Sequence, residues 1–292
     1  MASSNLIEKI KILRERTGAG MMDCKKALEE NNLDLDAAGD YLREKGIAKA
    51  AKKADRIAAE GLTEVVLCKG CGTCSIVEVN CETDFVSRGD AFHELVAETG
   101  KVVRHDKPAS LEAAKELLKE TYTDATVKIG EKLDFRRFEV IDVQEGQSIG
   151  TYIHMGGKIS VAVVLDKNNE ELANQLAMHI AANSPIYVTT EDIPADAIEK
   201  ETAIQLELMK NDPKLAGKPE AMLKNICKGK VNKVLFESVL SEQTYLLDDT
   251  KKVGQVLAEN GVKVVKFVRY GVGEGIEKRH EDFAAEVMNQ TK

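Results

Sequence analysis

The spacing of apolar residues changes at Gly61, and this change limits the fold more than any other feature of the sequence. Before Gly61, apolar residues recur at helical intervals. After it, they alternate with polar residues in 63–68 and again in 75–79. Alternation is typical of a strand with one buried face. Because the two runs flank the glycine-containing turn 69–72, the sequence predicts a β-hairpin that follows a helical segment.

A strand hairpin followed by a helix is predicted twice along the chain. The first hairpin precedes helical patterns at 90–103 and 111–121. Later strand and helix patterns lie at 135–143, 150–154, 159–165, 170–182, 245–247, 253–259 and 262–270. We therefore predict an α+β protein whose core consists of two similar α/β halves with antiparallel sheets.

Two stretches outside these halves carry helical patterns alone. Residues 1–56 are expected to form three short helices and a basic, alanine-rich linker, with Gly46 at the end of the third helix. Residues 187–233 are expected to form an antiparallel helical hairpin that either dimerises or packs on its own protein. We expect its two helices to face each other through Ile198, Ile204, Leu206, Met209, Leu215, Met222, Ile226 and Val231.

The segment Val79–Val86 carries the pattern most suggestive of function. A strand pattern ends there, and the carboxylate of Asp84 stands beside the ring of Phe85. A strand end can hold a short segment in a fixed pose. In one interpretation, Phe85 is a core residue and Asp84 caps the next helix, which the usual burial of large aromatics favours. In the other, Asp84 displaces ligands of a phosphate-bound metal and Phe85 wedges into another protein's apolar cleft.

Cys68, Cys71 and Cys74 have the spacing of zinc or iron–sulfur ligands, and Cys81 lies beyond them. The Cys-Pro ending of a ferredoxin motif is missing, and no second cysteine pair lies nearby. We therefore predict reduced thiols, with no metal and no cofactor. A redox or iron–sulfur protein is the alternative function.

No phosphate-binding loop is recognisable. Gly18–Gly20 lacks the preceding strand and the Lys-Ser/Thr ending, and Gly271–Gly275 has the wrong spacing for a dinucleotide fingerprint. The chain is thus expected to have no nucleotide site of its own. Its histidines are widely spread, and His154 at a turn between two strands is either an exposed contact residue or a structural one.

Composition limits the partners of the chain. The 49 acidic and 41 basic residues give a net charge of -8, and tryptophan is absent. Broad nucleic-acid binding requires a dense positive surface, and single strands require aromatic platforms. Neither a signal peptide nor a membrane-length apolar run is visible. We expect a cytoplasmic protein that docks on another protein and binds neither nucleic acid nor membrane.

Four motifs occur in order along the chain. They are LRERTGAGMMDCKKAL at Leu13–Leu28, EVNCETDFV at Glu78–Val86, YIHMGGKI at Tyr152–Ile159 and GVGEGIEK at Gly271–Lys278. One such match could arise by chance, but four in register could not. With them the chain resembles, over essentially its whole length, the bacterial elongation factor Ts family, the nucleotide exchange factors of elongation factor Tu.

The resemblance implies a particular order of parts. A three-helix, ubiquitin-associated-like module with its linker would occupy 1–56. The first half of the α/β core would be 57–148, and the second half 149–186 together with 234–270. A helical coiled-coil hairpin at 187–233, of a kind that mediates dimerisation, and a C-terminal helical module at 271–292 would complete the chain.

The resemblance also implies which residues meet the partner. One group would enter the nucleotide domain of elongation factor Tu beside its magnesium and promote GDP release so that GTP can bind: Thr83, Asp84, Phe85 and Val86. A second group would contact the same domain from the N-terminal module: Arg14, Met21, Met22 and Lys25. His154 would meet a different domain. No bond is broken, so the chain would be an exchange factor and not an enzyme. A helical scaffold built on 187–233 is a further alternative.

Overall fold

The strand hairpin predicted after Gly61 is the centre of the first sheet. Strand β1 (Glu60–Cys68) pairs antiparallel with β2 (Thr73–Cys81), and the register runs from Glu60 opposite Cys81 to Cys68 opposite Thr73. Strand β3 (Asp134–Asp142) completes the order β1-β2-β3. The computed structural model describes residues 2–52, 55–210, 215 and 219–276. Within these ranges the α+β class is confirmed.

The chain divides into two compact units. The first comprises Met1–Ile141, Ile153–Ser160 and Tyr270–Lys292, and the second comprises Asp142–Tyr152 and Val161–Arg269. The module boundaries expected from the sequence stay predictions. No helix within the described ranges is long and apolar enough to cross a membrane.

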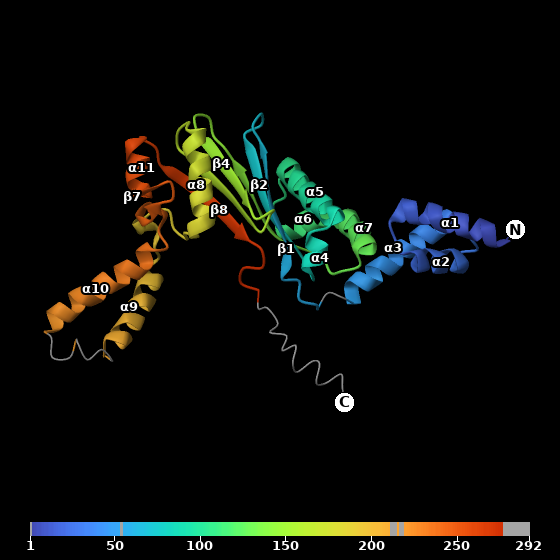
Figure 1. Cartoon of the computed structure of the whole chain (residues 1–292), viewed down its shortest axis with the longest axis horizontal. Coiled ribbons are helices and arrows are strands. Elements are labelled where there is room, and N and C mark those ends of the chain that lie inside the picture. The colour runs from blue at the N-terminus through green and yellow to red at the C-terminus, as the bar shows by residue number, and fades with distance from the viewer. Residues whose placement is uncertain (1, 53–54, 211–214, 216–218, 277–292) are drawn as a thin grey trace. The chain divides into compact units, whose positions relative to one another are not determined.

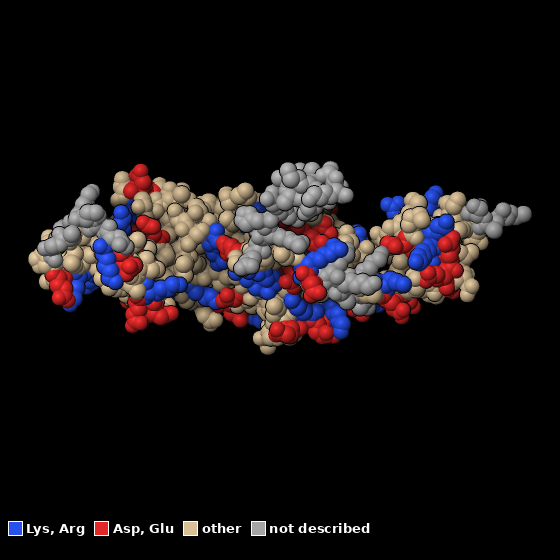
Figure 2. All heavy atoms as spheres, turned by 90° about the horizontal axis from the view of Figure 1, so that it is seen from below, with Lys and Arg blue, Asp and Glu red and all other residues tan. Residues whose placement is uncertain are grey.

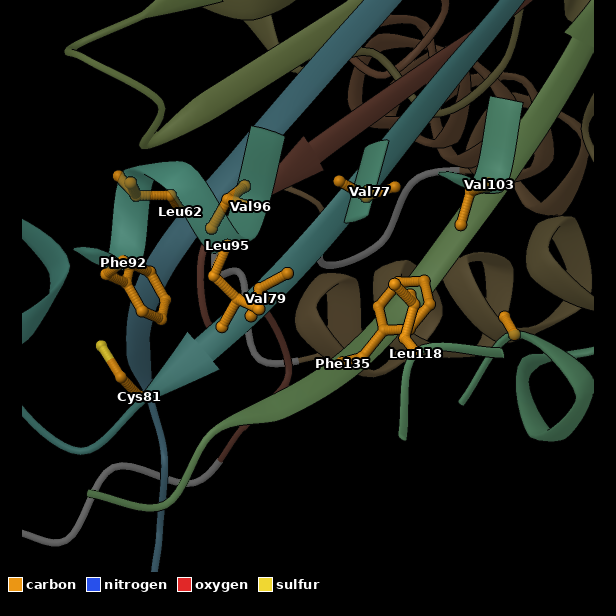
Figure 3. Close-up of a cluster of buried hydrophobic side chains, with 11 residues drawn as sticks. Leu62, Val77, Val79, Cys81, Phe92, Leu95, Val96, Val103, Leu118 and Phe135 are labelled. Atoms are coloured by element: carbon orange, nitrogen blue, oxygen red, sulfur yellow. The ribbon is translucent and has the colours of Figure 1, made fainter. Parts of the chain in front are cut away.

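Helices cover one face of the first sheet. They are α4 (Asp84–Ser87), α5 (Asp90–Asp106), α6 (Leu111–Leu117) and α7 (Lys119–Ile129). Figure 3 shows Val79 of β2 beside Leu95 of α5, while Phe135 of β3 lies beside Leu118. The single helix expected at 111–121 is instead two helices that meet at Leu118, whose side chain is buried in this core.

The other face of β2 is buried as well, which the alternating pattern did not predict. All nine residues of β2 are buried. On this face the carboxylate of Glu78 is inaccessible and accepts four hydrogen bonds. Its donors are Arg136 Nη1 at 2.9 Å, Arg137 Nε at 2.5 Å, Gly273 N at 2.8 Å and Asn80 Nδ2 at 3.2 Å. Two guanidinium groups and two neutral donors thus compensate for the burial of one charge.

The same guanidinium groups tie down the described part of the expected C-terminal module. Arg137 donates to Gly271 O at 3.1 Å and stacks 4.1 Å from the centre of the Tyr270 ring. Arg136 donates to Glu274 O. Of the module expected at 271–292, residues 277–292 lie outside the described residues.

The first three helices enclose a core of their own. They are α1 (Ala2–Thr17), α2 (Met21–Glu30) and α3 (Leu35–Lys52), and Leu13, Leu28 and Leu42 are buried among them. The expected stop at Gly46 is wrong, since α3 continues to Lys52. Gly46 is a packing position, because a Cβ there would collide with Val127 of α7.

The second unit repeats the plan of a three-stranded sheet with a helix. It contains most of strands β4 (Ser148–His154), β5 (Ile159–Leu165) and β8 (Val264–Gly271), which follow the order β4-β5-β8. Helix α8 (Glu170–Asn183) runs along this sheet (Figure 1). The remaining short elements are η1 (Thr190–Asp192), η2 (Leu240–Glu242), β6 (Thr244–Tyr245), β7 (Asp248–Lys252) and α11 (Val253–Glu259).

Helices α9 (Ala195–Lys210) and α10 (Glu220–Phe236) form the predicted helical hairpin (Figure 1). Its small core contains four of the expected facing residues: Met209, Leu215, Ile226 and Val231. The other four are exposed, so the expected apolar stripe is wrong at Ile198, Ile204, Leu206 and Met222. Cys227, which the pattern did not single out, lies in the core instead.

The buried Glu78 network gives a stability prediction. Removing one member of a buried ion pair leaves the other uncompensated, which costs about 3 kcal/mol or more. We expect Glu78→Gln to lower the free energy of unfolding by about 3 kcal/mol in urea denaturation. Glu116→Ala, which removes an exposed partner of Lys119, should change it little. Equal effects of the two substitutions would contradict the role given to Glu78.

Candidate functional site

The segment that follows β2 forms the single helical turn α4, and Thr83 caps it. Thr83 has extended backbone angles, and its Oγ1 accepts a hydrogen bond from Val86 N at 3.4 Å. Asp84 is the first helical residue, and the ring of Phe85 is 85% exposed. The interpretation with a buried Phe85 and a capping Asp84 is therefore wrong. Both side chains are accessible at the end of a fully buried strand.

The geometry of α4 explains why Phe85 faces solvent. Successive residues of a helix point about 100° apart, and Val86 packs against the core formed by β2 and α5. With Val86 turned inward, its neighbour turns outward. Among the phenylalanines that the structure describes, only Phe85 is exposed; the others are buried or partly buried. Burying such a ring is worth about 1.5–3 kcal/mol, and folding of this chain leaves that contribution unused.

The carboxylate of Asp84 pairs with Arg88 one turn later. Arg88 Nη2 lies 2.8 Å from Asp84 Oδ2; the Arg88 side chain is largely exposed, and that of Asp84 is partly exposed. An exposed pair of this kind contributes little to stability. The carboxylate can therefore leave Arg88 for a stronger partner at small cost.

Two glutamates hold the backbone before α4. Glu131 Oε2 accepts from Glu82 N at 3.1 Å and from Thr83 N at 3.0 Å, while Glu131 Oε1 accepts from Thr83 Oγ1 at 2.7 Å. In return, Glu82 Oε1 accepts from Lys132 N at 2.7 Å. The side chain of Glu82 also pairs with Arg56 at 2.9 Å.

The sequence did not single out Glu131, because nothing in its neighbourhood signals a contact 48 residues away. On the other side of the turn, Thr83 O accepts from Ser87 N at 3.3 Å and from the Cys81 thiol at 3.2 Å. Thr83 is thus held through its N–H, its hydroxyl and its carbonyl. The turn that carries Asp84 and Phe85 has little freedom to move.

The contact residues expected in the N-terminal module lie on accessible surface. Met21 and Met22 are in the first turn of α2 and are 58% and 73% exposed, while Arg14 is exposed near the end of α1. Lys25 is half-buried and lies 3.7 Å from Glu29. Cys24 faces the module's core. Exposed methionines make an adaptable apolar surface.

His154 is the last residue of β4 and precedes the turn 155–158 that leads to β5. Its carbonyl accepts from Gly157 N at 3.2 Å and Lys158 N at 3.1 Å, and its side chain is half-buried. Gly157 has a φ of +98°, and its carbonyl accepts from Thr63 N at 2.6 Å. The turn is therefore fixed to β1. The expected site residues occupy three different places: the α4 turn, the α1–α2 surface and this turn.

The cysteines do not assemble a metal site. Cys68 and Cys71 are joined in a disulfide, since the hairpin turn brings their Cα atoms to 5.6 Å, within the usual range for such a bond. The expectation of reduced thiols is wrong for this pair. Burial raises the pKa of the Cys74 and Cys81 thiols to about 12. Among the described residues, no group of three or more His, Cys, Asp and Glu side chains could hold a metal ion.

The described surface carries charges of both signs. On the face drawn in Figure 2, lysine and arginine side chains are interspersed with aspartate and glutamate. Mixed charge of this kind does not favour the broad phosphate contacts of a nucleic-acid-binding surface.

Comparison with known proteins gives one consistent result. A family described as elongation factor TS matches residues 82–274. Elongation factor Ts of Acholeplasma laidlawii (strain PG-8A) is 48% identical over 288 residues, which cover 96% of this chain and 97% of that protein. The match to the family includes the α4 turn.

The cysteine arrangement predicts unequal reactivity toward iodoacetamide. After reduction of the native protein at about pH 8, Cys71 should be alkylated first, because its side chain is exposed to the reagent. Cys74 and Cys81 should stay unlabelled until the chain is unfolded, since their raised pKa and burial suppress the thiolate. Peptide mass spectrometry checks this. Labelling of Cys74 as fast as Cys71 would contradict the buried position of Cys74.

Proposed function

Because the chain belongs to the elongation factor Ts family, we propose that it is a guanine nucleotide exchange factor that acts on elongation factor Tu during translation elongation. It binds the GDP-bound partner, promotes release of GDP and so allows GTP to bind. The observation that carries this proposal is the 85% exposed ring of Phe85 on a turn fixed at the end of a buried strand.

Such a protein can promote GDP release because its own binding to elongation factor Tu and the binding of GDP are thermodynamically linked. A protein that binds the nucleotide-free partner more tightly than the GDP-bound partner weakens GDP binding by the same factor. In our proposal Phe85 enters an apolar cleft of the partner's nucleotide domain and separates a helix contact there. Folding leaves the Phe85 ring exposed. Its burial in this cleft would then stabilise the complex with nucleotide-free elongation factor Tu. No bond is made or broken, so the chain is not an enzyme in the usual sense.

Asp84 adds an electrostatic contribution. Next to the partner's magnesium and phosphates, its carboxylate would compete with the metal's ligands and repel the phosphate oxygens. The ion pair with Arg88 does not prevent this, because breaking an ion pair at the surface costs little free energy. Arg88 could in turn meet a carboxylate or phosphate of the partner.

The other expected contact residues would give affinity and orientation. We assign Arg14, Met21, Met22 and Lys25 to contacts with the nucleotide domain, and His154 to contacts with a second domain. Thr83 and Val86 act differently in this proposal. Thr83 caps the α4 turn and Val86 anchors it in the core, so both support the exposed pair between them.

Release of a fluorescent GDP from elongation factor Tu tests the proposal. The chain should accelerate release, and Phe85→Ala should slow the accelerated rate by roughly 30-fold or more, since truncating an aromatic hot spot typically costs at least about 2 kcal/mol. The fold should persist, because the ring makes little contact with its own protein.

Leu117→Ala is the matched control. Leu117 is another exposed apolar residue of the same unit, and its truncation should leave the exchange rate unchanged. No acceleration by the unaltered chain would overturn the exchange-factor proposal and favour the helical scaffold. Normal exchange by Phe85→Ala would overturn the wedge role alone.

A further inference from the structure

The main-chain ladder ends just before the α4 turn, and a side chain takes over from it. Pairing of β2 with β1 stops at Cys81, opposite Glu60. The next two N–H groups, of Glu82 and Thr83, both donate to the carboxylate of Glu131. A charged acceptor makes such hydrogen bonds stronger than neutral ones. Glu131 therefore holds the backbone beyond the end of β2, as far as Thr83, the residue before α4.

The position of Glu131 is itself fixed. Helix α7 ends at Ile129 and is capped by Gly130, which has a φ of +82° and donates from its N–H to Thr126 O at 2.9 Å. Ile129 and Leu133, on the two sides of the loop, pack against the core under the first sheet. Lys132 N binds Glu82 in return. The carboxylate thus acts from a rigid loop.

The hydroxyl of Thr83 transmits this restraint to the helix cap. Thr83 Oγ1 donates its hydrogen to Glu131 Oε1 at 2.7 Å, which leaves its lone pairs for Val86 N. A hydroxyl has one hydrogen, so the bond to Glu131 orients the cap. A turn of four residues does not form stably by itself, because helix nucleation is unfavourable. Its shape therefore depends on such outside contacts.

From this geometry we infer that Glu131 is a positioning residue of the exchange site. It holds the α4 turn so that Phe85 and Asp84 already have their binding pose before elongation factor Tu arrives. This inference rests on the function proposed above. Without Glu131, the turn would have to be ordered during binding, and that ordering would lower the rate of productive association.

A cycle of four proteins tests the inference: the unaltered chain, Glu131→Ala, Phe85→Ala and the double variant. Their second-order rate constants for GDP release from elongation factor Tu are compared below saturation. We expect Glu131→Ala to slow exchange roughly tenfold when Phe85 is present, because the ring must then be ordered on binding. With Phe85→Ala the further loss of rate should be clearly smaller, since only Asp84 then remains to be positioned.

Thermal melting separates this role from a purely structural one. Glu131→Ala should lower the melting temperature by the same amount with and without Phe85. It should lower the rate constant of GDP release more when Phe85 is present. Glu131→Gln, which keeps one carbonyl acceptor, should recover part of the rate. Glu116→Ala, at an exposed glutamate, should leave the rate unchanged. An equal loss of rate in both backgrounds, or none, would overturn the inference.

Amide hydrogen exchange of the free chain gives a readout independent of elongation factor Tu. In Glu131→Ala, or in Glu131→Gln if the alanine variant fails to fold, the amides of Glu82 and Thr83 should exchange faster while those of β2 stay protected. Unchanged protection of these two amides would overturn the inference. If the unaltered chain does not accelerate GDP release, the exchange-factor proposal fails, and the hydrogen-exchange result still decides whether Glu131 holds the turn.

Discussion

The burial of β2 on both faces is the constraint on which the rest of the first unit depends. One face carries the apolar core under α5, and the other carries the charge of Glu78, which two arginines of β3 neutralise. Because a buried carboxylate needs its partners, strand β3 and the segment after β8 are held against β2. The last residue of such a strand is fixed in place, and α4 begins three residues later.

Rigidity at this point has a functional consequence. A large exposed ring on a mobile loop would collapse onto its own protein or lose entropy on binding. Here, Val86 anchors one side of the turn in the core and Glu131 holds the other through Thr83. Phe85 therefore stays exposed, and its burial can contribute to a complex.

Much of this arrangement follows from local sequence, and the rest does not. Alternation and helical spacing predicted the β1–β2 hairpin, α5, α8 and the helical pair α9–α10. The contacts of Glu78 with Arg136 and of Thr83 with Glu131 join residues about fifty positions apart, so no local pattern contains them. Residue type alone placed Phe85 in the core, because the inward turn of Val86 became visible only in three dimensions. The predicted helix end at Gly46 was wrong for the same reason, because Gly46 packs against α7 and does not end α3.

In the proposed complex, Phe85 is the part of this chain that enters elongation factor Tu. Photo-cross-linking from Phe85→p-benzoylphenylalanine tests it directly, with the same photoreactive residue in place of the exposed Leu117 as the reference. We expect a cross-link from position 85 to the nucleotide domain of elongation factor Tu and none from position 117. A cross-link from position 117 alone, or from position 85 only to other copies of this chain, would contradict it.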